Sequence, residues 1–131
     1  MSKYERDITA ACEAETDERA RHVLRLQHSI YLSRKEDLQS ARDLCMFVRK
    51  ACSASADPLV FGWLNLAEGI HDYFALGPQN AIPKLVRSKV IAGTSRDGLK
   101  VINLACAWLG NVYRILERWD DFRAEMIECR R

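Results

Sequence analysis

The chain has 131 residues, of which 48% are apolar and 29% charged, with a formal net charge of +2. This size and composition suit one globular domain with its own core and exclude a disordered segment. No run approaches the roughly 20 apolar residues of a membrane span, and the charged start lacks the apolar centre of a signal peptide, so we expect a cytoplasmic protein.

Apolar residues recur at steps of three and four along nearly the whole chain, which predicts helices rather than strands. Residues 1–13 are expected to form a short first helix. A second helix begins after a capping residue, Thr16 or Asp17, and ends near Ser33. A third helix covers about residues 37–52 and carries its apolar side chains on one face.

The next two helices are marked by proline and glycine. Residues 53–57 are expected to form a loop, after which Asp57 caps a helix that has Pro58 as its first residue and that Gly77 ends. Asn80 is the expected cap of the following helix, because Pro83 then falls in the first turn, where a missing N–H disrupts no hydrogen bond.

The last third of the chain carries the signals for two more helices. The Gly93-Thr94 pair ends the preceding helix, and Ser95 is the expected cap of a fifth helix that runs to about Glu117. Asp120 opens a sixth, which continues to the end of the chain.

The helix pairs repeat at a spacing near 40 residues. A shift of 40 aligns Val23 with Trp63, Leu26 with Leu66, Ile30 with Ile70 and Ala41 with Ala81. Between the second and third pairs, a shift of 43 aligns the first helices and a shift of 41 aligns the second helices. A period near 40 with two helices per unit is typical of a solenoid, here a single domain over residues 1–131 with units at about 17–53, 57–92 and 95–131.

The third unit resembles a tetratricopeptide repeat. The runs that carry the resemblance are Leu109-Gly110-Asn111-Val112-Tyr113 and Trp119-Asp120-Asp121-Phe122-Arg123. Phe122 fills a usually small site and the period exceeds the family's, as in the divergent N-terminal repeats of bacterial signalling proteins such as diguanylate cyclases. The resemblance implies an all-α, right-handed α-solenoid of about three antiparallel helix pairs. It also implies a regulatory, protein-binding module that is part of a longer chain.

In the resembling family the first helix of each pair lines a concave groove. Transferred to this chain, the groove carries two polar columns and one apolar column. The polar columns are His28, Glu68 and Asn111, and Tyr31, His71 and Arg114. The apolar column is Leu24, Leu64 and Ala107, and Arg21 is a further polar residue of the groove. We expect a peptide with a basic or amide group near Glu68 and a carboxylate near Arg114, although Leu24 and Leu64 equally suit the core.

The end of the chain leaves apolar residues without a polar helix to cover them. Met126, Ile127 and Cys129 lie in the last predicted helix, and nothing follows that could cap the stack. Either the natural chain continues or this face pairs with a second copy of the chain.

The five cysteines are odd in number and lack a Cys-x-x-Cys motif, so we interpret them as buried free thiols. They are Cys12, Cys45, Cys52, Cys106 and Cys129. Cys45 and Cys52 lie two helical turns apart, too far to share one ion. We therefore expect neither a bound metal nor a cofactor.

Two other functions were weighed against peptide binding. Glu68, His71 and Asp72 suggest a helical metal-dependent protein, but the chain has no second Glu-x-x-His. A weak nucleic-acid binder would use basic residues of the second helices, namely Arg42, Arg49, Lys50, Lys84, Arg87 and Lys89. The modest charge makes nucleic acid an improbable partner, and without a phosphate-binding loop or nucleophile motif the chain is not expected to be an enzyme.

Overall fold

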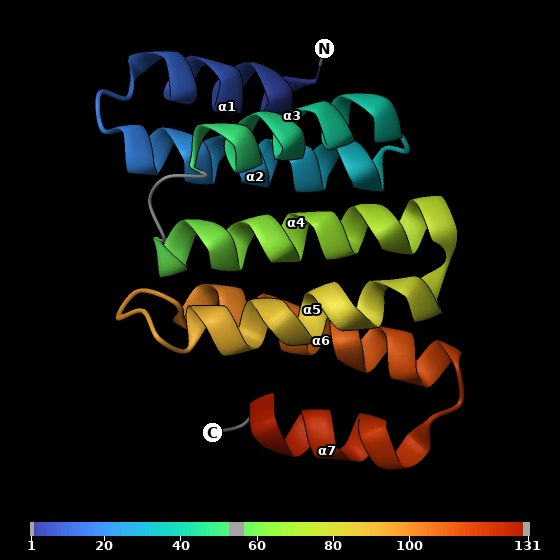
Figure 1. The fold of residues 1–131 in the computed structure, drawn as a ribbon. Helices are drawn as coiled ribbons and strands as arrows, with labels where there is room; N and C mark the ends of the chain where they lie inside the picture. The colour runs from blue at the N-terminus through green and yellow to red at the C-terminus, as the bar shows by residue number, and fades with distance from the viewer. Residues whose placement is uncertain (1, 53–56, 130–131) are drawn as a thin grey trace.

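The computed structural model describes residues 2–52 and 57–129, and within these ranges the regular secondary structure is entirely α-helical (Figure 1). The helices are α1 (Lys3–Ala14), α2 (Glu18–Arg34), α3 (Leu38–Ala51), α4 (Pro58–Leu76), α5 (Pro78–Ala92), α6 (Leu99–Ile115) and α7 (Trp119–Cys129). The all-α prediction is confirmed. Most of the expected loop at residues 53–57, and the end of the last helix beyond residue 129, lie outside the described residues.

Consecutive helices run antiparallel and stack into an elongated molecule (Figure 1). Helices α2, α4 and α6 run in one direction, and α1, α3, α5 and α7 run in the other. Each helix packs on its neighbours in the chain, and α4 also packs on α2 and α6. The hairpins α2–α3, α4–α5 and α6–α7 thus form a helical repeat-like arrangement, with α1 covering one end.

The turns inside the three hairpins share a backbone feature. Glu36, Gly77 and Glu117 are the described residues with positive φ, at 63°, 108° and 56°, and they lie 41 and 40 residues apart. After Glu36, the amide of Asp37 donates to the carbonyl of Leu32 at 2.9 Å. After Glu117, the amide of Arg118 donates to the carbonyl of Tyr113 at 2.8 Å. Such bonds satisfy carbonyls at the ends of α2 and α6.

Polar side chains cap the first four helices. Ser2 forms a capping box with Glu5 at the start of α1. Asp17, Asp37 and Asp57 cap α2, α3 and α4, each accepting a hydrogen bond from a backbone amide of the first turn. Of the two candidates for the first helix pair, Asp17 is therefore the cap.

The predicted start of α5 is wrong. The helix begins at Pro78, immediately after Gly77, so Pro83 lies in its second turn rather than its first. Asn80 does not cap α5, because its amide Nδ2 donates to the carbonyl of Leu76 at 2.7 Å and so satisfies the end of α4. The same side chain can serve either helix end, and only the tight α4–α5 turn decides between them.

The predicted cap of α6 is also wrong. Ser95 lies in the turn of residues 93–98, where its hydroxyl accepts from the amide of Asp97 at 3.4 Å, and Gly98 directly precedes the first helical residue. A Cβ atom at Gly98 would lie 2.0 Å from the carbonyl oxygen of Ala92. The backbone of the turn passes so close to the end of α5 that only glycine fits there.

The core extends through the stack from α2 to α6. Its largest fully buried apolar side chains are Leu26, Val48, Val60, Leu64, Leu66, Ile70, Leu85, Val101, Leu109 and Val112. Small residues allow close packing. Ala67 is fully buried, and a Cβ atom at Gly110 would lie 2.6 Å from the terminal methyl of Met126 on α7.

The apolar face at the end of the stack is narrower than predicted. Met126 packs inward on Gly110, and Cys129 is half-buried, while Ile127 is 61% exposed.

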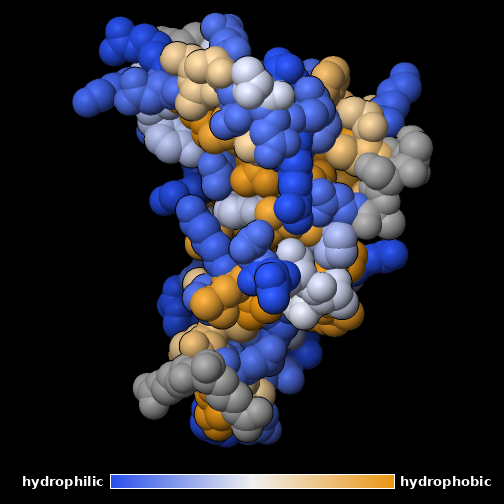
Figure 2. Space-filling view, turned by 90° about the vertical axis from the view of Figure 1, so that its left-hand side faces the viewer, coloured by the Kyte–Doolittle hydropathy of each residue, from blue (hydrophilic) through white to orange (hydrophobic). Residues whose placement is uncertain are grey.

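Figure 2, which looks at the side where α2, α4 and α6 begin, shows hydrophobic and hydrophilic residues interspersed. None of the described helices is both long and apolar enough to cross a bilayer.

Replacing Gly98 by alanine should destabilise the fold by about 1–3 kcal/mol, because the added Cβ must displace the backbone at the end of α5. Chemical denaturation would measure this. Gly93→Ala is the matched control, since Gly93 is exposed and already in a right-handed helical conformation that alanine adopts freely. Equal stability of the two variants would contradict the steric argument.

Candidate binding site

A cavity of about 610 Å³ lies between α3, α4 and α5, and we call it the α3–α5 cavity. Helix α3 contributes Leu38, Gln39, Arg42, Cys45 and Met46; α4 contributes Glu68, His71, Asp72, Ala75 and Leu76; and α5 contributes Lys84. These residues recur at steps of three and four, so one face of α3 lies opposite one face of α4. The lining therefore combines apolar and charged side chains.

Glu68 is the central charge of the α3–α5 cavity. Its carboxylate accepts from the Nε and Nη2 atoms of Arg49 on α3 and from the Nζ atom of Lys84 on α5, the last at 3.1 Å. The bond to Glu68 raises the pKa of the Arg49 guanidinium. One carboxylate on α4 thus connects both helices that flank it.

Three further polar side chains in the wall of the cavity are His71, Asp72 and Cys45. His71 Nδ1 lies 3.2 Å from Asp72 Oδ1, and both side chains are partly buried. Burial raises the pKa of the Cys45 thiol to about 11, although the Ser29 hydroxyl lies 3.2 Å from its sulfur. At neutral pH Cys45 is therefore a protonated thiol, which is a poor nucleophile.

Glu68, His71 and Asp72 share the cavity, but Glu68 already holds two cationic side chains. In the part of the chain that the structure describes, the side chains that could jointly hold a metal ion are Cys106, Glu125 and Cys129. Sequence reasoning missed this cluster. The one local signal for it in the sequence was the four-residue spacing of Glu125 and Cys129, which places both side chains on the same face of a helix.

Several basic residues suggested for nucleic-acid binding lie in ion pairs. Arg49 and Lys84 pair with Glu68, and Lys89 pairs with Glu125 and Glu128, each at 2.9 Å. Side chains held by carboxylates of their own chain are less available to phosphates. The arrangement gives the nucleic-acid hypothesis no support.

Three of the predicted groove residues face α1. The hydroxyl of Tyr31 donates to Ser2 Oγ at 2.7 Å, and His28 Nε2 lies 3.9 Å from a carboxylate oxygen of Glu5. The backbone carbonyl of Arg21 lies 3.9 Å from the sulfur of Cys12. The short first helix thus covers the α2 portion of the predicted groove.

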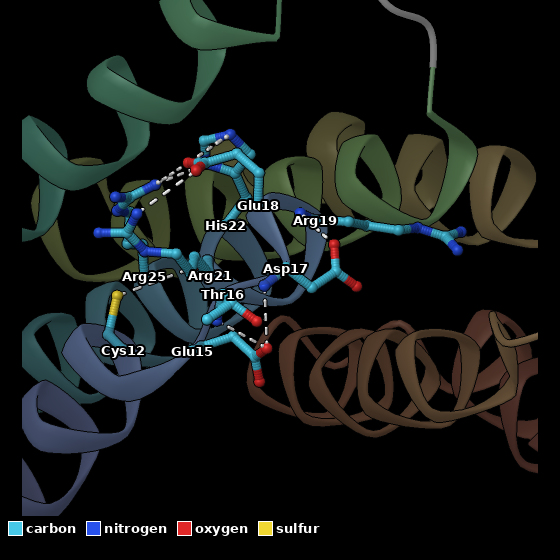
Figure 3. A network of polar contacts seen from close by, with 9 residues as sticks. All are labelled: Cys12, Glu15, Thr16, Asp17, Glu18, Arg19, Arg21, His22 and Arg25. Carbon is cyan, nitrogen blue, oxygen red and sulfur yellow. Dashed lines mark hydrogen bonds and ion pairs between the residues drawn. The ribbon is translucent and has the colours of Figure 1, made fainter.

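Arg21 also belongs to a polar network at the start of α2 (Figure 3). Glu18 lies within 3.4 Å of Arg21 and 3.2 Å of Arg25, and 3.6 Å from Nε2 of the buried His22. Arg25 lies 2.9 Å from His22 Nδ1. Burial, assisted by the charge of Arg25, lowers the pKa of His22, so this imidazole is neutral at pH 7.

Asn111 and Arg114 lie together on α6, away from α1. Asn111 donates to the hydroxyl of Tyr73 on α4 at 3.4 Å and accepts from Arg114 at 2.9 Å. Ala107, Trp108 and Asn111 line a small hollow of about 220 Å³.

The structure therefore divides the seven predicted polar residues among three places: beneath α1, in the α3–α5 cavity, and on α6. Of the apolar column, Leu64 is fully buried in the core, Leu24 is half-buried and Ala107 is exposed. A partner-binding role for these residues stays a prediction.

Comparisons with known protein families, with curated proteins and with solved structures found no match to this chain. The resemblance to tetratricopeptide repeats gains no support from them.

We predict that the free energy of unfolding decreases as the pH falls from 7 towards 5, by at most about 1.4 kcal/mol per pH unit from His22. The unfolded chain takes up a proton near pH 6.5, whereas the folded chain, with the lowered pKa of His22, does so only at lower pH. Protonation thus favours unfolding in this window. Urea denaturation at several pH values should show that the unfolding free energy of the His22→Asn variant depends less on pH. An unchanged pH dependence would exclude His22 as its source.

Exchanging Glu68 for glutamine should destabilise the fold by about 1 kcal/mol, because Arg49 and Lys84 lose their counter-ion; their partial exposure keeps the effect small. Glu13→Gln, on an exposed part of α1, is the control. In a double-mutant cycle, Glu68→Gln and Lys84→Met should be less than additive. Full additivity in thermal melts would show that the pair is not coupled.

Proposed function

We propose that this chain is a tetratricopeptide-like repeat module that binds a peptide segment of a protein partner in the α3–α5 cavity. Its mechanism is binding, and no bond is made or broken. The observation that carries the proposal is the cavity itself, whose volume of about 610 Å³ lies in the range of ligand-binding sites. The proposed binding site is therefore the α3–α5 cavity and not the groove lined by the first helix of each pair.

The lining of the cavity favours a particular kind of segment. Leu38, Met46 and Leu76 offer apolar contacts for a hydrophobic side chain. Glu68 is already satisfied by two cations, so a basic group of the peptide would compete with an existing interaction.

Basic and acidic side chains line the cavity in equal number, with Arg42 and Lys84 against Glu68 and Asp72. Lys84 and the neighbouring Arg49 are both bonded to Glu68. Arg42 in the wall suits a carboxylate on the incoming peptide. We therefore propose a segment that carries a hydrophobic side chain next to an acidic one, which replaces our expectation of a basic group near Glu68.

The right-handed solenoid arrangement and a regulatory role belong to the same proposal. Support for the solenoid comes from the alternating helices and from the three hairpin turns at spacings of 41 and 40 residues. The role as a regulatory part of a bacterial signalling protein rests on the resemblance of the repeats alone.

Peptide selection followed by calorimetry tests the proposal. Random peptides displayed on phage would be selected against the purified chain, and synthetic copies of the enriched sequences titrated into it. We expect enrichment of peptides with adjacent hydrophobic and acidic residues. Arg42→Glu should weaken their binding by at least about tenfold, or about 1.4 kcal/mol, because it places a like charge opposite the carboxylate.

Arg87→Glu is the matched control, because Arg87 is also an exposed arginine on the second helix of a pair but does not line the cavity. It should leave the affinity unchanged. Peptides that bind both variants as tightly as the original chain would place the binding site elsewhere.

A further inference from the structure

We infer that Cys106, Glu125 and Cys129 form a binding site for one zinc ion that ties α7 to α6. The site lies at the end of the stack opposite α1 and is independent of the α3–α5 cavity.

The three side chains converge from two helices. Cys106 lies in the middle of α6, while Glu125 and Cys129 lie four residues apart on the same face of α7. Their ligand atoms, two sulfurs and a carboxylate oxygen, all lie within 4.8 Å of one another. Cys106 and Glu125 are buried and Cys129 is half-buried, so the cluster faces the inside of the hairpin.

These distances suit a tetrahedral metal. Two thiolates bound to zinc at about 2.3 Å lie about 3.8 Å apart, so small side-chain rotations would complete the coordination. Thiolate ligands favour zinc over calcium, magnesium or manganese, whose usual ligands are oxygens. Three protein ligands leave a fourth position for a water molecule.

Lys89 on α5 supplies the outer contact that such a site needs. Its Nζ atom lies 2.9 and 3.0 Å from the two oxygens of Glu125 and 2.9 Å from Glu128. It orients the Glu125 carboxylate, and each oxygen keeps a lone pair for a metal.

The charges also balance. When zinc binds, Cys106 and Cys129 each release a proton to the solvent and become thiolates. One zinc ion, two thiolates, the Glu125 carboxylate and the Lys89 ammonium together carry no net charge, and Glu128, the second partner of Lys89, is exposed to solvent. A buried site of this kind therefore avoids the penalty for an uncompensated charge.

The place of the site allows a bound ion to stabilise α7, although this site has three protein ligands and closed structural zinc sites have four. Helix α7 has 11 residues, and the described helices on which it packs lie on one side of it, chiefly α6. Met126 against Gly110 is its close apolar contact with α6. A metal bridge close to this contact would hold the end of α7 in place.

Cobalt substitution tests the inference directly. The chain would be purified with a reductant, stripped with a chelator and titrated with Co²⁺. We expect one ion per chain, with the intense visible bands of tetrahedral cobalt and a thiolate-to-metal charge-transfer band in the near ultraviolet. Added Zn²⁺ should displace the cobalt and raise the melting temperature.

Cys129→Ser is the principal variant, since Cys129 is half-buried at the end of α7 and its loss should leave the fold intact. It should remove at least half of the charge-transfer intensity, because only Cys106 can then supply a thiolate, and Glu125→Gln should weaken zinc binding at least about tenfold. Cys45→Ser and Cys52→Ser, which alter buried cysteines elsewhere, should retain the full signal.

Three outcomes would overturn the inference. The first is a cobalt titration of the reduced chain without tetrahedral bands. The second is a charge-transfer band of undiminished intensity in Cys129→Ser. The third is the formation of a Cys106–Cys129 disulfide in air by a chain that binds no cobalt when it is reduced. That result would make the two cysteines a redox pair.

Discussion

The structure depends on the burial of α4. From Val60 to Ile70 this helix has buried residues on nearly every side, including Trp63, Leu64 and Leu66. A helix that is apolar all round must be surrounded by other helices. Helices α2, α3, α5 and α6 all pack on α4, so the hairpins before and after it are held by one central element.

Ion pairs add to the contacts between packed helices and also reach between helices that are not neighbours in the stack. Arg19 at the start of α2 reaches the capping Asp57 of α4 at 2.8 Å, and Glu68 joins α4 to α3 and α5. Lys89 connects α5 with α7, and its hydrogen bonds to Glu125 and Glu128 outweigh burial and raise its pKa to about 12. Exposed pairs add little stability each.

The two proposed sites lie in different parts of this arrangement and use different chemistry. The α3–α5 cavity is open, and its wall combines apolar side chains with basic and acidic groups in equal number, which suits a peptide. The cluster of Cys106, Glu125 and Cys129 faces the inside of the last hairpin and suits a metal ion. Binding of a partner and reinforcement of the repeat end can therefore occur independently.

The sequence by itself determined where most helices lie. Asp17, Asp37 and Asp57 satisfy amides in their own first turn, and Gly77 ends its own helix, so each signal acts over a few residues and can be read locally. The repeat spacing also predicted the hairpins, because each unit buries the same face of its helices.

Only the tertiary structure decided which surfaces meet. Gly98 precedes α6 because of its contact with Ala92 on another helix, and Glu68 faces Arg49 and Lys84 rather than the predicted groove. Cys106 approaches Cys129 although 23 positions separate them in the sequence. Helical periodicity tells which residues share a face of one helix. Which neighbouring helix covers that face depends on how the hairpins pack, and this is a property of the whole chain.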